Sequence, residues 1–174
     1  MHMLGSNKLG ALGVLVVDAI EGALGGLSPS AAALLLTLHY RPGITITQLA
    51  KVAGIAQPTA VRVLDGLARR GWLERPARVG RTKPLLLTAA GKRQARSLQA
   101  ARLGAMDRLL AALPRQARVT FEKSLDKILA AATTSRAFAR TTCRLCDHLS
   151  CEEPLCPLGT RAAELERAIS KSGR

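Results

Sequence analysis

The stretch QPTAVRVLDGLARRGWLER, at residues 57–75, contains the start, the apolar stripe and the end of one short helix. Pro58 suits the first turn of a helix, where its missing N–H is not needed, and Gly71 suits the position just after the last turn. The apolar stripe, which we expect to face the core, consists of Val61, Leu64, Leu67 and Ala68.

The residues before this helix predict a second short helix. Thr47 is a plausible N-cap for a helix over residues 48–52, which Gly54 would end. Residues 44–46 alternate in polarity and could form a very short strand. Two short helices joined by a glycine-containing turn are typical of the helix-turn-helix motif.

Two short strands and four further helices complete the predicted layout. Residues 72–75 and 84–87 read as a hairpin whose basic tip, residues 76–83, carries Gly80. Helices are expected over residues 8–24, over 31–38 after the start signal Ser28-Pro29, over 89–113 after a Thr88 cap, and over 115–140. The fold class is therefore mainly α with a small β wing, a winged helix-turn-helix flanked by long helices.

The net charge of +14 predicts a polyanionic partner. Between Arg41 and Arg96 there are twelve Lys and Arg residues against Asp65 and Glu74 alone, a local net charge of +10, while the flanks are closer to neutral. A basic stripe of this kind matches the binding of phosphates along a nucleic acid, and an anionic membrane or a merely solvated surface are the alternatives.

We expect no membrane-spanning segment or export signal and a cytoplasmic protein. Residues 9–27 are apolar, but Asp18 and Glu21 interrupt them and several glycines dilute them. A spanning helix needs about 20 apolar residues, so an amphipathic first helix fits this stretch better.

The order of elements and several strings resemble the MarR family (multiple-antibiotic-resistance type) of transcription regulators over residues 12–139. The strings are Leu27-Ser28-Pro29, residues 57–65, residues 69–75 and Leu87-Thr88-Ala89-Ala90-Gly91. The resemblance implies a homodimeric regulator of double-stranded DNA, by default a repressor, that a small-molecule effector such as an aromatic acid can control. It divides most of the chain into an N-terminal dimerisation helix (1–27), a winged helix-turn-helix DNA-binding domain (28–91) and long C-terminal dimerisation helices (92–142). Residues 143–174 lie outside the resemblance and are expected to form a cysteine-rich metal-binding tail.

The helix over residues 58–70 is the candidate recognition helix. Because such a helix presents its N-terminal residues to base edges, Gln57, Thr59 and Arg62 are the predicted readers, with Ala60 close by. Gln can pair with adenine and Arg with guanine. The other predicted DNA-binding residues are Arg69 and, on the wing, Arg78, Arg81 and Lys83. By resemblance Arg81 enters the minor groove, although Gly80 replaces the Asp that usually precedes it.

All four cysteines lie in the tail, as Cys143-x2-Cys146-x4-Cys151-x4-Cys156-Pro157. Four thiols this close together suggest a shared ligand. Disulfides do not suit a reducing cytoplasm, and structural zinc sites usually use two separated pairs. A proline after the last cysteine and a short irregular loop favour an iron–sulfur cluster. We predict that an iron–sulfur cluster or the redox state at Cys143, Cys146, Cys151 and Cys156 modulates DNA affinity, by repositioning the last long helix in the dimer interface. Structural zinc is the alternative.

The sequence gives little support to an enzyme. No glycine-rich phosphate loop follows a strand, and His2, His39 and His148 are the only histidines. A redox enzyme or electron carrier is the remote alternative, and we expect no catalytic residues.

Overall fold

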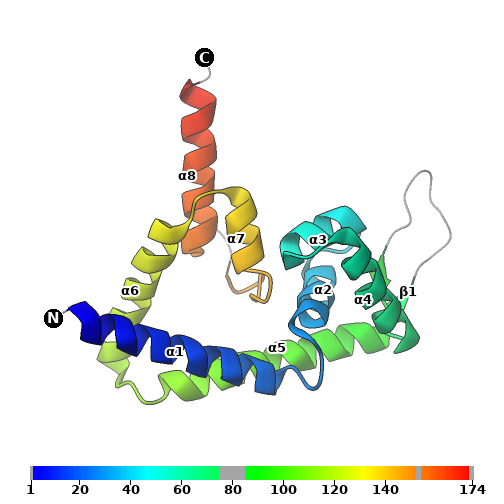
Figure 1. The fold of residues 1–174 in the computed structure, drawn as a ribbon, viewed down its shortest axis with the longest axis horizontal. Coiled ribbons are helices and arrows are strands. Elements are labelled where there is room, and N and C mark those ends of the chain that lie inside the picture. The colour runs from blue at the N-terminus through cyan, green and yellow to red at the C-terminus, as the bar shows by residue number, and fades with distance from the viewer. Residues whose placement is uncertain (1, 75–84, 152–153, 173–174) are drawn as a thin grey trace.

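The computed structural model describes residues 2–74, 85–151 and 154–172, which form a helical molecule with a small two-stranded sheet (Figure 1). The helices and strands are α1 (His2–Ala23), α2 (Pro29–Tyr40), α3 (Ile46–Ala53), α4 (Gln57–Arg69), β1 (Leu73–Glu74), β2 (Leu86–Leu87), α5 (Ala89–Leu110), α6 (Arg115–Ala132), α7 (Arg136–Thr142) and α8 (Pro157–Ser172).

Local capping signals set most helix ends. The Ser28 side chain accepts a hydrogen bond from the Ala31 amide at 3.2 Å, and Thr88 caps α5 in the same way. The predicted Thr47 cap for α3 is wrong, because Thr45 and Gln48 form a reciprocal capping box that starts the helix slightly earlier. Residues 44 and 45 are therefore extended without forming the predicted strand.

The helix-turn-helix is present as predicted. Gly54 ends α3 in the left-handed conformation, with φ of 68°, and Gly71 after α4 has φ of 69°. The strands β1 and β2 pair antiparallel, with Leu73 opposite Leu87 and Glu74 opposite Leu86. They are shorter than predicted, and the expected hairpin tip lies outside the described residues.

The core of the DNA-binding unit is built around α2. Residues 31–38 are all buried, and α2 packs against α3, α4, α5 and β2. Its leucines join Leu49, Leu64 and Leu98 in one cluster. Leu98 of α5 therefore belongs to the core of its own chain. With 2% aromatic residues, packing of leucine and alanine has to supply the burial.

The helix α1 runs alongside α5 (Figure 1). Leu12, Val16 and Ile20 are half-buried, but Val14 is 61% and Leu15 is 55% exposed. The predicted amphipathic helix thus has a second apolar face that its own chain leaves uncovered. By length and composition alone, residues 3–23 could also cross a membrane.

The predicted long helix over residues 115–140 is two helices. The chain leaves helical geometry at Thr133, and the Ser135 side chain caps α7 by accepting from the Phe138 amide at 3.1 Å. Ser and Thr here favour a cap over a helix interior. After this break α7 packs against α3 and α8, and α8 packs back on α6. Residues 157–172 form the helix α8.

Gly91 is required at its position, because a Cβ there would lie 2.1 Å from the Trp72 carbonyl oxygen. That oxygen also accepts the Thr88 amide at 3.1 Å, so the wing and α5 are joined at this point. We expect Gly91→Ala to destabilise the fold by about 1–3 kcal/mol through overpacking, despite the better helix propensity of alanine. Urea unfolding followed by circular dichroism measures this.

Gly104 in the same helix is the control. A Cβ added at Gly104 would have a terminal nitrogen of Arg108 as its nearest neighbour, at 3.8 Å, so there is space for a methyl group. We expect Gly104→Ala to be neutral or to stabilise by up to about 1 kcal/mol at the same protein concentration. Equal unfolding midpoints for the two variants would contradict the close approach at Gly91.

Candidate functional site

The helix α4 presents most of the predicted DNA-reading side chains to solvent. Gln57, Thr59, Arg62 and Arg69 are exposed. Ala60 is wrong as a DNA-binding residue, because its side chain is 0% exposed and lies in the core. Its small methyl group instead helps to set how closely α4 packs against α2 and α3.

Packing and one polar contact hold the start of α4. Ala60, Leu64 and Leu67 are its buried residues, and Thr47 of α3 donates a hydrogen bond to the Gln57 Oε1 atom at 3.3 Å. No side chain caps the helix at Ala56. The first N–H groups of α4 therefore remain available, and such groups suit a phosphate oxygen.

The base of the wing lies next to α4, because β1 contacts both α4 and β2. Arg78, Arg81 and Lys83 belong to the segment between these strands and lie outside the described residues. Arg70, which the sequence pattern did not single out, stacks over the Trp72 ring at 5.1 Å from its centre.

The four cysteines gather in a second, smaller core beside α7 and α8. Cys143 ends α7 and Cys156 precedes α8, and both are buried with Ala139, Leu158 and Ala162. Cys146 and Cys151 are half-buried against this cluster. All four are free thiols. The four side chains that the sequence suggested would share a ligand therefore lie in one cluster.

Neighbouring thiols change one another's pKa through hydrogen bonds and charge. A hydrogen bond from Cys143 lowers the pKa of Cys146 to about 7, aided by the Arg102 charge and opposed by burial. The same bond, followed by burial, raises the pKa of Cys143. Burial, with the neighbouring Cys156, raises the pKa of Cys151 to about 11. One proton is thus shared unequally between Cys143 and Cys146, and thiolate character concentrates on Cys146.

The cavity beside the thiols has a basic lining. Cys143, Cys151 and Cys156 open onto a cavity of about 560 Å³, whose basic lining residues are Arg41, Arg136, Arg140 and His148. The Gly159 amide donates to the Cys156 sulfur at 3.3 Å. In this conformation, and within the described residues, no three His, Cys, Asp or Glu side chains are arranged so that they could hold a metal ion.

The sequence pattern did not single out these arginines. Arg41 is distant from the cysteines along the chain, whereas Arg136 and Arg140 lie on α7, shortly before Cys143. Arg136 also joins α7 to α8 through Glu166, with 2.9 Å between the nitrogen and the carboxylate oxygen. This contact holds the pKa of Glu166 below its ordinary value. The spacing of basic residues along α7 was the only available signal.

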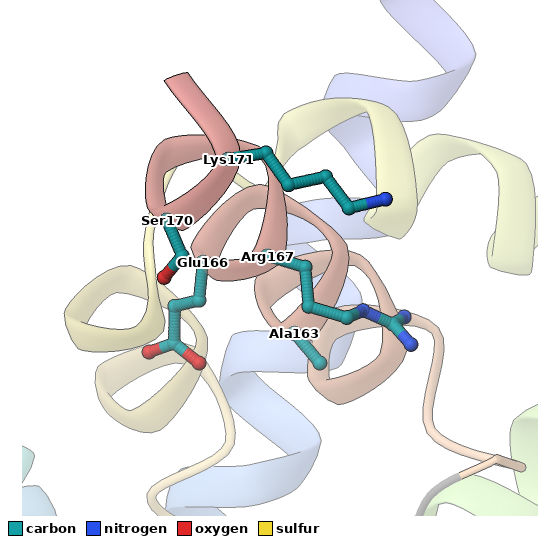
Figure 2. A pocket seen from close by; sticks show the side chains of 5 residues that line it. All are labelled: Ala163, Glu166, Arg167, Ser170 and Lys171. Carbon is teal, nitrogen blue, oxygen red and sulfur yellow. The ribbon is translucent and has the colours of Figure 1, made fainter. Parts of the chain in front are cut away.

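Another hollow, on α8, has no comparable chemistry. Figure 2 shows Glu166 and Ser170 on one side of α8 and Arg167 and Lys171 on the other. Because all five lining residues, including Ala163, belong to a single helix, this surface is an open helix face.

Comparison with known proteins agrees with this geometry. The MarR family model matches residues 27–80, which include α2 to α4 and β1. The HTH-type transcriptional repressor Rv2887 of Mycobacterium tuberculosis is 31% identical over 121 residues, covering 67% of this chain and 87% of the repressor. The four cysteines lie outside the residues that the family model matches.

Solved structures give the same result. A crystal structure of Rv2887 superposes with a TM-score of 0.60 at 27% identity, covering 70% of this chain and 91% of the other. Rv2887 in complex with DNA gives a TM-score of 0.59 at 25% identity, covering 71% and 95%. Rv2887 in complex with salicylic acid gives 0.56 at 30% identity, covering 70% and 93%.

The exposed side chains of α4, the helix-turn-helix that carries them and the likeness to a repressor over most of its length agree with one another. The chain belongs to the MarR family of winged helix-turn-helix transcription regulators and is not an enzyme.

Proposed function

We propose that the chain is a homodimeric transcriptional repressor that reads double-stranded DNA with the start of α4. The observation that carries this proposal is the exposed set Gln57, Thr59 and Arg62 on a helix whose opposite face is locked into the core. The related repressor Rv2887 has been crystallised with DNA. Arg69, with Arg78, Arg81 and Lys83 of the wing, supplies further positive charge for phosphates or the minor groove.

Removal of the Arg62 side chain tests the reading of bases. We expect Arg62→Ala to weaken binding to a duplex selected by the wild-type protein from a random pool by roughly 5- to 150-fold, the value of one bidentate base contact. Fluorescence anisotropy at fixed salt measures both this duplex and a scrambled one. The loss should be smaller on the scrambled duplex, because only the base contact is specific.

Arg167→Ala is the matched control. Arg167 is exposed on α8, away from α4, and the substitution removes the same charge. Its affinity for the selected duplex should match that of the wild type. Equal losses for Arg62→Ala and Arg167→Ala would mean that Arg62 contributes only general charge.

The second element of the proposal is a dimer formed through α1 and α6. The outer face of α1 exposes Leu9, Val14 and Leu15, and α6 has no buried residue in its own chain while Ile128 is 53% exposed. Apolar surface of this extent requires a partner. A second copy places two α4 helices on two half-sites about 34–36 Å apart.

We expect Leu15→Glu to give a folded monomer, because a charge cannot be buried in an apolar interface at low cost. Light scattering reports the mass, and DNA affinity should fall by at least about tenfold as the second half-site is lost. Ser170→Glu, on exposed α8, is the control and should remain a dimer. Dimeric Leu15→Glu would place the interface elsewhere, and binding of the wild type to lipid vesicles would assign this face to a membrane.

The third element is that the four cysteines hold an iron–sulfur cluster that modulates DNA affinity. The clustered thiols, the arginines that line their cavity and the Gly159 amide on the Cys156 sulfur support it, since positive charge and hydrogen bonds to sulfur stabilise an anionic cluster. Each ligand loses its proton on binding, and the sulfurs must move from their present contacts to surround the metal.

Metal and sulfide analysis of protein purified without oxygen tests this element. We expect brown protein that contains iron and acid-labile sulfide, and loss of both in Cys151→Ser but not in the neighbouring Ser150→Ala. DNA affinity should differ between cluster-loaded and cluster-free wild type. Colourless protein with one zinc per chain would contradict the cluster and indicate a structural zinc site.

One observation favours a second candidate function, control by a small aromatic acid with structural zinc at the cysteines. The related repressor Rv2887 has been crystallised with salicylic acid and with p-aminosalicylic acid. DNA affinity that responds to salicylate and is indifferent to the cluster would select this candidate.

A further inference from the structure

The cysteine tail does not hang free of the DNA-binding unit but is docked on it. The Thr141 hydroxyl in α7 donates a hydrogen bond to the Lys51 carbonyl oxygen, in the last turn of α3, at 3.2 Å. The Thr141 methyl group lies where a Cβ at Gly54 would meet it at 3.4 Å. The last turn of α7, which ends at Cys143, is therefore in direct contact with the end of α3.

The loop between the cysteines contacts α5 as well. Gln99 is 5% exposed, and in the amide orientation that satisfies both of its ends it donates to the Leu145 carbonyl at 3.2 Å and accepts from the Asp147 amide at 3.0 Å. The Leu145 side chain packs on the main core. Cys146 thus stands between two residues whose backbones are held by one buried side chain.

A third contact is made with the end of α2. The Tyr40 hydroxyl donates to the Asp147 carboxylate, and the Tyr40 ring meets the His148 ring edge-on with 5.6 Å between centres. Burial and this hydrogen bond raise the pKa of Tyr40 to about 12. For Asp147, burial opposes ionisation, but hydrogen bonds from Leu149, Ser150 and Tyr40 keep its pKa below the ordinary value.

The first of these contacts, made by Thr141, lies at the turn of the helix-turn-helix. Gly54 is the left-handed residue from which the chain turns into α4, and its amide also bonds to the Lys51 carbonyl at 3.3 Å. The same oxygen therefore accepts from Thr141 of the tail and from the first residue of the turn. The helices α3 and α4 pack together and share the Thr47–Gln57 hydrogen bond. The end of α7 and the start of α4 are therefore joined by a continuous series of packed elements.

We propose that the state of the four-cysteine site reaches the recognition helix within one chain, through the docking of α7 and residues 143–151 on α3, α2 and α5, with Thr141 as the positioning residue. This inference rests on the proposed cluster-dependent DNA binding. It adds a route within the chain to the one through the last long dimerisation helix, because the break at residues 133–135 turns α7 toward α3 while α8 and the cysteine cluster still contact α6. Loading moves the sulfurs, and the pinned loop transfers that movement to α3.

The test compares DNA affinity in two forms of each full-length variant. One form is reconstituted without oxygen with iron and sulfide, and the other is stripped with a chelator; anisotropy measures each on the selected duplex. We expect the wild-type affinities to differ by about 5- to 150-fold. Thr141→Val keeps the shape of the side chain and removes the hydroxyl. It should load the same iron and reduce this ratio by about 2- to 10-fold, the effect of one hydrogen bond.

Two variants control for the substitution itself. Thr141→Ser restores the hydroxyl and should restore the wild-type ratio, and Thr142→Val alters the exposed neighbouring residue and should leave the ratio unchanged. A loaded Thr141→Val protein with the full wild-type ratio would overturn the proposed route while leaving the cluster switch intact. A wild-type ratio of one would refute the cluster switch, and the route with it.

Hydrogen exchange on the wild type gives a second readout that needs no variant. Amides at residues 51–57 should exchange at different rates in the loaded and stripped forms, because the end of α3 and the turn respond to the tail. Identical exchange there, with changes confined to α1 and α6, would assign the transmission to the dimer helices and overturn the proposal.

Discussion

Burial of α2 is the constraint on which the rest of the molecule depends. This helix contacts α3, α4, α5 and β2, and residues 31–38 are all withdrawn from solvent. With two phenylalanines, one tyrosine and one tryptophan in the whole chain, the core is filled by leucine and alanine from every neighbouring helix. Such packing leaves little freedom to shift α4 alone, so its exposed face is held in one position relative to the wing and α3.

The same close packing explains why small residues occupy two key positions. Ala60 lets α4 approach the core where a larger side chain would lift its N-terminal turn. Gly91 lets the Trp72 carbonyl reach the first turn of α5, which ties the start of β1, the first strand of the wing, to the long helix. Both residues lie next to the candidate DNA interface, and both act through the space they leave rather than through contact with a ligand.

The tail adds a second core, and the residues of the first core are buried without it. Cys143, Cys156 and their neighbours form a cluster of their own, and Leu145 is the one hydrophobic residue among the described tail residues that packs against the main core. Because α7 packs on α3 and α8 packs on α6, the tail bridges the DNA-binding unit and the long helices. A ligand at the thiols would therefore act on a part of the chain that touches both.

The sequence by itself determined the helix-turn-helix, the caps at Ser28 and Thr88, the glycine ends at Gly54 and Gly71, and the grouping of the four cysteines. Each of these is set by residues within a few positions of one another, through capping, φ preference or short loop closure. Only the tertiary structure decided that Ala60 is buried, that Gln99 holds the cysteine loop and that Thr141 meets Lys51. The last contact joins residues 90 positions apart. It depends on the break before α7 and on how whole helices pack. A local sequence pattern cannot predict a contact between residues so far apart in the chain.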